Sequence, residues 1–368
     1  MLVIILIQLI LANITSLWCA LNNAFGANNE WEGIAKEGLH AALNRFGYKG
    51  VVILGSTFMH YSFEKAAEIL GIGIKNLVRI PVDRHNAIDL RSLKDSIAES
   101  KRRKLCIIAL VGIAGSTSTG SIDPLMDMAE ISAENKIHFH VDAAWGGPLL
   151  FSNEYKHKLN GIEYADTVTI DGHKQMYLPI GTGMVFFRNP STAKGIKKNA
   201  QYIIRDNSYD LGKFSLEGSR PGNVLYLHAA LNIIGGEGYN FLINESIRKT
   251  QYMERSIQLR DEFELLSPSQ INILVYRYIP KEYRSMLANG MLTEYENNII
   301  NKYNECIQKF QRQSGKSFVS RTTINIFKSN NTFSSIALRA VIANPLTSEN
   351  DIDEVLNEQV LIAQRIQF

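Results

Sequence analysis

Two apolar runs of this chain each lead to a polar side chain, and this arrangement constrains the fold more than any other feature. The run 137–141 directly precedes Asp142. The run 165–170 leads through Asp171 to Lys174. Short apolar runs bounded by polar residues and glycine are typical of buried strands. Because open α/β sheets bind their ligands at the carboxyl ends of strands, we expect Asp142 and Lys174 to lie at one edge of a largely parallel sheet.

The chemistry of these two side chains is complementary. A lysine amine forms a Schiff base with an aldehyde cofactor, and a buried carboxylate keeps a pyridine nitrogen protonated. Pyridoxal phosphate needs both groups. Each residue alone has an ordinary alternative, because a lysine after a strand is usually a surface residue and an aspartate there often caps a helix. Together they indicate a pyridoxal 5'-phosphate site, with Asp142 at the ring nitrogen and Lys174 at the aldehyde.

Apolar runs alternate with helical patterns along most of the chain. Strands are predicted at 50–54, 105–111, 137–141, 167–170 and 183–188, and helices at 63–70 and 125–135. Ser62 and Asp123-Pro124 are the predicted starts of these two helices. The alternation predicts an α/β fold with a mainly parallel sheet. From about residue 265 the pattern changes, so we expect a large cofactor-binding domain at 1–264 and a small α+β domain at 265–368.

Several motifs together resemble the group II pyridoxal-dependent amino-acid decarboxylases, which include glutamate and aromatic amino-acid decarboxylases. The resemblance is carried by His140-Val141-Asp142-Ala143-Ala144-Trp145-Gly146-Gly147, Asp171-Gly172-His173-Lys174, His60-Tyr61-Ser62 with Lys65-Ala66-Ala67, Gly115-Ser116-Thr117 with Asp123-Pro124, and Ala337-Leu338-Arg339 with Ile342-Ala343-Asn344-Pro345. The segment Leu216-Glu217-Gly218-Ser219-Arg220-Pro221-Gly222 resembles the bacterial pyridoxal-dependent aspartate decarboxylase branch, close to glutamate decarboxylases. The implied fold is the type I PLP-dependent transferase fold, with a seven-stranded sheet in the large domain.

The resemblance implies roles for further residues around the cofactor. His60 corresponds to a histidine that stacks over the cofactor ring, and Ala144 would lie against the opposite ring face. Ser116 would lie near the ring and His173 near the phosphate. His60 could instead be satisfied at a helix start, and Ser116 could serve its local turn. Asp171 is not assigned as a ligand, because a carboxylate would repel the phosphate.

Two more residues are implied in handling the substrate. Tyr202 corresponds to a loop tyrosine that protonates the substrate carbanion after carbon dioxide leaves, with Tyr209 as the alternative. Arg339 corresponds to an arginine that grips a substrate carboxylate, and a strand-edge salt bridge is its alternative. The implied reaction is decarboxylation through an aldimine at Lys174. Aspartate is the first expected substrate, glutamate the second and an aromatic amino acid the third.

The start of the chain departs from the family pattern. Residues 6–10 read Leu-Ile-Gln-Leu-Ile where relatives carry a phosphate loop rich in glycine and hydroxyl groups. The apolar run is too short for a membrane span, and the absence of lysine and arginine before Lys36 does not fit a secretory signal. We therefore expect a truncated protein in which Met1–Leu11 is not native family sequence. A catalytically inactive remnant or partner-binding paralogue is the alternative function, and an aminotransferase or desulfurase of the same fold is a third.

Composition and charge exclude several classes of function. The net charge of +3 over 368 residues is too small to indicate binding of nucleic acid or of an anionic membrane. Cys19, Cys106 and Cys306 are far apart and lack metal-ligand spacing, which favours a reducing cytoplasm and no metal site. The family resemblance further implies a homodimer that binds a small amino acid.

Overall fold

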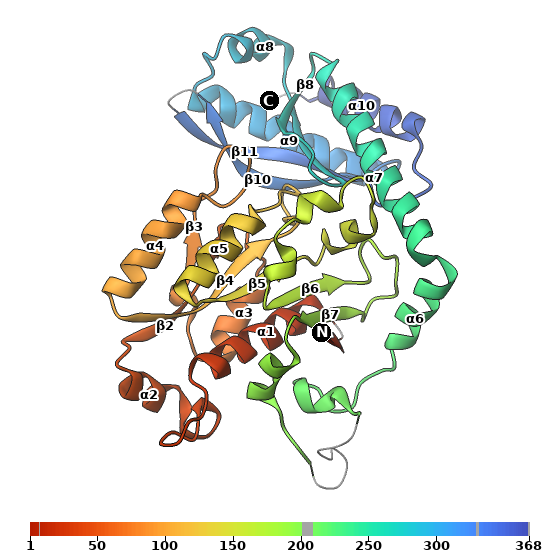
Figure 1. Cartoon of the computed structure of the whole chain (residues 1–368). Helices are drawn as coiled ribbons and strands as arrows, with labels where there is room; N and C mark the ends of the chain where they lie inside the picture. Colours follow the sequence, from red (N-terminus) through yellow and green to blue (C-terminus); the bar gives the residue numbers. More distant parts are fainter. Residues whose placement is uncertain (7, 201–208, 329–330, 367–368) are drawn as a thin grey trace. The chain divides into compact units, whose positions relative to one another are not determined.

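The chain folds into two units in a computed structural model that describes all residues except 7, 201–208, 329–330 and 367–368 (Figure 1). Unit 1 comprises Met1–Asp83, Ala87–Ser116 and Ile122–Asn240, and unit 2 comprises Arg84–Asn86, Thr117–Ser121 and Phe241–Phe368. The division falls inside one long helix, α7 (Gly235–Gln258). The boundary at residue 264 stays a prediction about independently folding domains.

Unit 1 is built on a sheet that has seven strands in the described part of the chain, in the order β1-β7-β6-β5-β4-β2-β3. The strands are β1 (Leu2–Leu6), β2 (Gly50–Ser56), β3 (Leu77–Ile80), β4 (Leu105–Ile113), β5 (His138–Asp142), β6 (Thr167–Asp171) and β7 (Gly183–Phe187). β7 is antiparallel to both of its neighbours, and the other pairs are parallel. The predicted α/β class is confirmed.

Helices cover both faces of this sheet. They are α1 (Leu9–Ala24), α2 (Ile34–Phe46), α3 (Ser62–Ile69), α4 (Leu90–Arg102), α5 (Leu125–Asn135) and α6 (Val224–Ile233), joined by the 3-10 helices η1 (Ile74–Asn76), η2 (Gly147–Phe151), η3 (Lys156–Leu159), η4 (Ile162–Tyr164), η5 (Pro190–Ile196) and η6 (Leu211–Phe214). Val51 and Val111 share a core with Ile14 of α1. Gly112, on the other face of β4, lies against Leu125 of α5. Burial on both faces explains why the central strands are rich in apolar residues.

The apolar start of the chain forms the edge strand β1. Ile4 pairs with Val185 of β7, and both side chains are buried in one cluster. Gly183 lies where β1 turns into α1, since a Cβ added there would be 2.5 Å from the backbone carbonyl carbon of Gln8. The absence of a side chain at Gly183 therefore lets the start of α1 pack closely against β7. None of the helices in the described ranges is long and apolar enough to cross a membrane.

Unit 2 is an antiparallel sheet with helices packed on it. Its strands, in the order β10-β11-β9-β8, are β8 (Phe263–Ser267), β9 (Ile273–Tyr278), β10 (Ser320–Lys328) and β11 (Asn331–Val341), and its helices besides α7 are α8 (Lys281–Ala288), α9 (Glu294–Ser314) and α10 (Glu349–Ala363). Thr293 and Glu296 form a capping box at the start of α9. Tyr276, Leu338 and Leu356 lie in its apolar core.

Both predicted helices of unit 1 begin where the sequence indicated, within one residue, but their predicted caps differ from the structure. Ser62 is the buried first residue of α3, and the N-cap residue Tyr61 makes no side-chain cap hydrogen bond. Asp123 does not cap α5. Its carboxylate accepts hydrogen bonds from the backbone N–H groups of Ile88 (2.8 Å) and Ile113 (2.9 Å), and burial raises its pKa to about 7. The Asp123 side chain therefore links a loop to β4 instead of capping α5, which starts two residues later.

Candidate active site

The sheet brings the predicted cofactor residues Asp142 and Lys174 into one region. Asp142 is the last residue of β5, and Lys174 follows the end of β6, its parallel neighbour. Adjacent parallel strands end at the same edge of a sheet. His60, which lies between β2 and α3, feels the charges of both residues, because Asp142 raises its pKa and Lys174 lowers it. The structure thus brings these three predicted residues into the same region of unit 1.

Asp142 is held from two sides. Its side chain is buried, and Oδ1 accepts the backbone N–H of Ala144 at 3.2 Å. Oδ2 accepts a hydrogen bond from Asn13 Nδ2 at 3.0 Å. Hydrogen bonds to an ionised carboxylate are roughly twice as strong as bonds between neutral groups. The carboxylate is therefore fixed in direction at the end of β5.

A buried polar network continues from Asp142 through the sheet. His140 Nε2 donates to Asn13 Oδ1 (3.0 Å), and His140 Nδ1 lies 2.9 Å from both Ser16 Oγ and Thr167 Oγ1. His138 Nε2 lies 2.8 Å from the same Thr167 oxygen. Burial lowers the pKa of His140 to about 3 and that of His138 to about 4. Both imidazoles are consequently neutral at pH 7.

The buried imidazole of His140 predicts a loss of stability in acid. An unfolded histidine has a pKa of about 6.5, and the folded value is about 3. Between pH 6 and 4 the unfolded chain therefore binds a proton at His140 that the folded chain does not. The stabilisation is fully present above the unfolded pKa and falls with pH. We expect the wild type to lose about 1.4 kcal/mol per pH unit more than His140→Gln in this window.

Urea unfolding of both proteins at several pH values measures this difference. Asp123 has a raised pKa and acts with the opposite sign, but it is present in both proteins and cancels. Equal pH slopes in the two proteins would show that His140 is protonated in the folded chain.

Lys174 has a buried carboxylate as its partner. Its Nζ lies 3.0 Å from Asp171 Oδ2 and 6.0 Å from the centre of the Trp145 ring. His173 Nε2 lies 3.6 Å from the same Asp171 oxygen. Burial raises the pKa of Asp171, while the nearby charges of Lys174 and His173 lower it. Asp171 was not predicted as a site residue, although its position three residues before Lys174 at a strand end was a signal for this ion pair.

His60 presents a neutral, partly buried ring. The backbone N–H of Ser62 donates to His60 Nδ1 at 3.2 Å, so the ring proton lies on Nε2. Burial lowers the pKa of His60. Its ring centre is 4.1 Å from that of Tyr61, with the planes tilted by 40°. A neutral planar group is what stacking on a cofactor ring requires, and the predicted stacking role stays a prediction.

The family model described as the pyridoxal-dependent decarboxylase conserved domain matches residues 30–279. The chain belongs to this family. An aspartate 1-decarboxylase of Aliivibrio fischeri is 44% identical over 359 residues, which are 96% of this chain and 65% of that protein. An acidic amino acid decarboxylase of Xenopus tropicalis is 29% identical over 318 residues, 84% of this chain and 60% of that one. The chain thus spans less than two thirds of the length of these curated relatives.

Solved structures of decarboxylases share the fold of this family member. The crystal structure of mouse CSAD matches with a TM-score of 0.86 and 22% identity, covering 99% of this chain and 72% of that chain. The glutamate decarboxylase domain of a Vibrio parahaemolyticus protein matches with a TM-score of 0.78 and 21% identity, covering 99% of this chain and 68% of the other. At these identities the likeness concerns the fold alone. The expected PLP-dependent transferase fold is confirmed.

The residues at the strand ends fit the ring of pyridoxal phosphate, the cofactor of the decarboxylase family. Asp142 supplies a fixed carboxylate and Lys174 an amine. Within the described residues, His173 Nδ1 is buried without a hydrogen-bond partner, which suits its predicted place near a phosphate. Ala144 and Ser116 are both buried, and their contacts with the ring stay predictions.

The phosphate end of the site has fewer donors than the family pattern. The turn from β1 to α1 carries Gln8, Leu9 and Ile10, none with a hydroxyl group. Gln8 makes no side-chain cap bond, and its carbonyl accepts the backbone N–H of Ala12. Among the described residues of this turn, the donors are the side-chain amide of Gln8 and the backbone N–H groups in the first turn of α1. The positive end of a helix attracts anions, and a phosphate site at the start of α1 stays a prediction.

The predicted substrate residues belong to other parts of the chain. Tyr202 lies outside the described residues, and its alternative Tyr209 is fully exposed. Arg339 belongs to unit 2, where its guanidinium donates to Thr117 O (2.6 Å) and Ser320 Oγ (3.1 Å). Burial lowers its pKa. Its partners in the described chain are neutral oxygens rather than a carboxylate, and its role stays a prediction.

Proposed function

We propose that this chain is a pyridoxal-phosphate-dependent carboxy-lyase for acidic L-amino acids, with aspartate as its first substrate and glutamate as its second. One observation carries the proposal. The ion pair of Lys174 with buried Asp171 lies in the same strand-end region as Asp142, in a chain 44% identical to an aspartate 1-decarboxylase. The resemblance to an acidic amino acid decarboxylase supports the wider substrate class.

The proposed mechanism divides the work among a few residues. When bound, pyridoxal phosphate supplies a protonated pyridine ring that accepts the electron pair left as the α-carboxylate departs. Asp142 would hold the proton on the ring nitrogen, because Ala144 and Asn13 fix its carboxylate. Lys174 Nζ would bind the aldehyde end of the cofactor. Asp171, 3.0 Å away, takes the proton that this amine must lose to act as a nucleophile.

Two residues complete the proposal on the substrate side. Tyr202 donates the proton that replaces carbon dioxide at the α-carbon, for which a phenol shielded from water is suitable. Arg339 binds a substrate carboxylate. Its present partners are neutral oxygens, so its positive charge is available to an anion, and a planar guanidinium matches a carboxylate with two parallel hydrogen bonds.

Product analysis tests the substrate proposal. We expect the purified chain with pyridoxal phosphate to release carbon dioxide and form β-alanine from L-aspartate. One methylene in a fitted site changes kcat/KM by roughly 10- to 200-fold, so we expect L-glutamate to be poorer by at least about tenfold. L-tyrosine is the control for an aromatic substrate. Faster release from L-tyrosine, or amino-group transfer to a keto acid without carbon dioxide, would replace this proposal by one of the other activities of the fold.

The alternative is a catalytically inactive member that binds no cofactor. The glycine-free turn between β1 and α1 favours it, because two lost phosphate donors cost about 3–6 kcal/mol of binding. Titration of the folded wild type with pyridoxal phosphate decides between the two. No uptake at saturating concentration supports the inactive chain.

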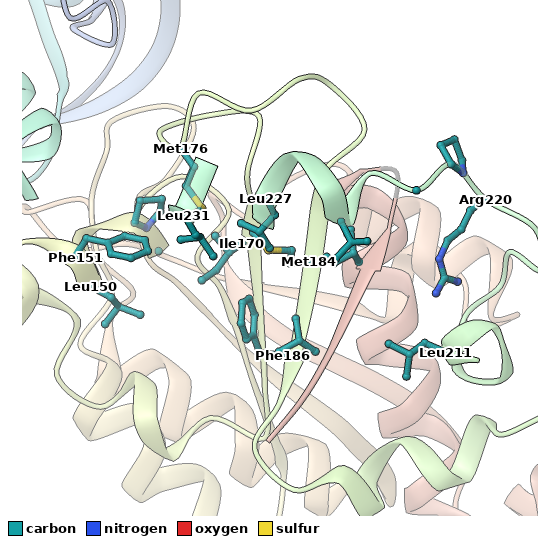
Figure 2. A pocket seen from close by; sticks show the side chains of 17 residues that line it. Leu150, Phe151, Ile170, Met176, Met184, Phe186, Leu211, Arg220, Leu227 and Leu231 are labelled. Atoms are coloured by element: carbon teal, nitrogen blue, oxygen red, sulfur yellow. The ribbon is translucent and has the colours of Figure 1, made fainter. Parts of the chain in front are cut away.

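We further propose a homodimer formed through α6. None of its residues is buried, and Leu225 and Ile233 are 69% and 83% exposed. α6 also borders an apolar cavity of about 740 Å³. Figure 2 shows Leu227 and Leu231 of α6 pointing towards the cavity from one side and Phe186 of β7 from the other. Apolar surface of this extent on a monomer usually marks an interaction site.

Light scattering on size-exclusion fractions measures the oligomeric state of the chain. We expect a dimer for the wild type and a monomer for Ile233→Glu, because a buried charge at an interface costs several kcal/mol. Ile69→Glu on α3 is the control, since Ile69 is 63% exposed and lies on another element. A wild-type monomer at micromolar concentration would rule out α6 as a dimer interface.

The cysteines support a cytoplasmic location for this enzyme. All three are free, with Cys19 buried and the other two partly buried. Free thiols persist in reducing compartments, whereas secreted proteins usually pair them. We therefore propose the cytoplasm as the site of the reaction.

A further inference from the structure

We infer that Asn13 is a positioning residue for two groups predicted to contact the cofactor ring. It orients Asp142, predicted at the ring nitrogen, directly, and it orients His60, predicted over the ring face, through Ser62. The inference rests on the proposed cofactor site. Asn13 is fully buried in the first half of α1. Among the described residues, Asn13 makes no hydrogen bond to His60 or Lys174. It would therefore act through its neighbours.

The amide of Asn13 uses all of its hydrogen-bonding groups. Nδ2 lies 3.0 Å from Asp142 Oδ2 and 3.0 Å from Ser62 Oγ, and Oδ1 lies 3.0 Å from His140 Nε2. A carboxylate only accepts hydrogen bonds, so the NH₂ group must face Asp142. Rotating the amide by 180° would place its oxygen against the carboxylate. The orientation of Asn13 is therefore determined by chemistry.

This orientation also determines the tautomer of His140. Because Asn13 Oδ1 only accepts, His140 must carry its proton on Nε2. Its Nδ1 then accepts from the hydroxyl groups of Ser16 or Thr167, both 2.9 Å away. The burial that lowers the pKa of His140 keeps the ring neutral. His140 of β5 thus fixes the side chain of Asn13 through this hydrogen bond.

The second side-chain N–H of Asn13 connects to His60, the residue predicted to stack on the cofactor ring, through Ser62. It donates to Ser62 Oγ, while the backbone N–H of the same Ser62 donates to His60 Nδ1 at 3.2 Å. Ser62 is fully buried at the start of α3. One amide therefore links the carboxylate predicted at the ring nitrogen to the imidazole predicted over the ring face. Moving Asn13 would disturb both contacts together.

A purely structural role for Asn13 is the competing explanation, and the same helix offers a matched control. Asn22 is also buried on α1, but its Nδ2 donates to Trp18 O at 2.8 Å within the helix. Asn22→Ala removes a buried amide without touching Asp142. Thr15→Val is a second control, because Thr15 Oγ1 is buried without a hydrogen-bond partner among the described residues.

The experiment compares Asn13→Asp and Asn13→Leu with these controls. Asn13→Asp keeps an acceptor for His140 but removes the donor to Asp142, and Asn13→Leu removes all three bonds at similar volume. The first measurement is ¹⁵N NMR of the histidine rings in the cofactor-free protein. We expect a neutral His140 with its proton on Nε2 in the wild type and in Asn13→Asp, and loss of that protected N–H in Asn13→Leu.

The second measurement is the dissociation constant and absorption spectrum of bound pyridoxal phosphate. A hydrogen bond to a charged group corresponds to roughly ten- to a hundredfold in affinity, so we expect both Asn13 variants to bind that much more weakly and with a shifted band. Asn22→Ala and Thr15→Val should bind within about threefold of the wild type with an unchanged band. Thermal melting of each cofactor-free variant reports its stability separately.

Three outcomes overturn the inference. One is wild-type affinity and spectrum in Asn13→Asp. Another is an affinity loss that follows the melting temperature equally in the Asn13 and Asn22 variants. The third is a wild-type His140 protonated on Nδ1, which shows the hydrogen-bond directions to be wrong. A wild type that takes up no pyridoxal phosphate overturns the proposed function instead, and the NMR result then decides on Asn13 alone.

Discussion

Lys174→Ala is expected to abolish the covalent attachment of pyridoxal phosphate and to lower the decarboxylation rate by roughly three powers of ten or more, as removal of a covalent catalyst usually does. In the wild type, borohydride should make the link permanent and add a pyridoxyl group to the peptide that contains Lys174. Mass spectrometry of the digested protein measures this directly. The ion pair with Asp171 places the amine at the strand end where the site is predicted.

Lys65→Ala is the matched control for Lys174. Lys65 is the other lysine whose charge lowers the pKa of His60, but it is exposed on α3 over the ring of Tyr61. We expect this variant to be labelled at Lys174 like the wild type. A pyridoxyl group at Lys65, or one that survives in Lys174→Ala, would assign the aldehyde to a different amine.

The central strands of unit 1 were predictable because burial on both faces leaves a clear sequence signal. The runs that predicted β2, β4, β5, β6 and β7 are short, mostly apolar segments flanked by polar turns, and the structure confirms all five within a few residues. β3 was missed because it is only Leu77–Ile80 and contains Arg79. β1 was missed for a different reason. Its apolar run resembles part of a targeting segment, and its pairing with β7 is not visible in the sequence.

The candidate site was predictable where strand ends carry its chemistry. Asp142 and Lys174 follow apolar runs, so their proximity follows from a parallel sheet. Asn13 and Ser16 were not found, because polar residues on a helix usually face water and nothing in the sequence shows that this face is buried. Their spacing of three residues, which puts both on one helix face, was the available signal.

The side-chain partners of helix starts were harder still to predict. Ser62 and Asp123 are residue types that favour helix N-caps, yet each is used by a segment far away in the sequence. Ser62 Oγ accepts a hydrogen bond from Asn13 Nδ2, and the Asp123 carboxylate accepts one from the backbone N–H of Ile88. Tertiary contacts therefore took over groups that local propensity had assigned to the helix.

Unit 2 contains a buried ion pair whose loss is expected to have the largest effect on stability. Arg277 of β9 is 2% exposed, and its Nε lies 2.6 Å from Glu264 Oε2. Its Nη1 donates to Asn297 Oδ1 (2.7 Å) and Ser335 Oγ (3.3 Å). Arg277→Met would remove the positive charge beside Glu264 and one donor each to the buried side chains of Asn297 and Ser335. Removing one partner of a buried pair costs about 3–5 kcal/mol, so we expect a loss of that size in the free energy of unfolding.

Arg321→Met is the control for this prediction, because the pair of Arg321 with Glu305 is nearly half exposed. Exposed pairs contribute about 0–1 kcal/mol. The measurement must report on unit 2. All three tryptophans lie in unit 1, so their fluorescence would follow the wrong part of the chain. Hydrogen exchange of β9 peptides reports on unit 2, and urea unfolding followed by circular dichroism gives the free energy of unfolding. Similar losses in the two variants would mean that water reaches Arg277 and that the charge is not isolated in the core.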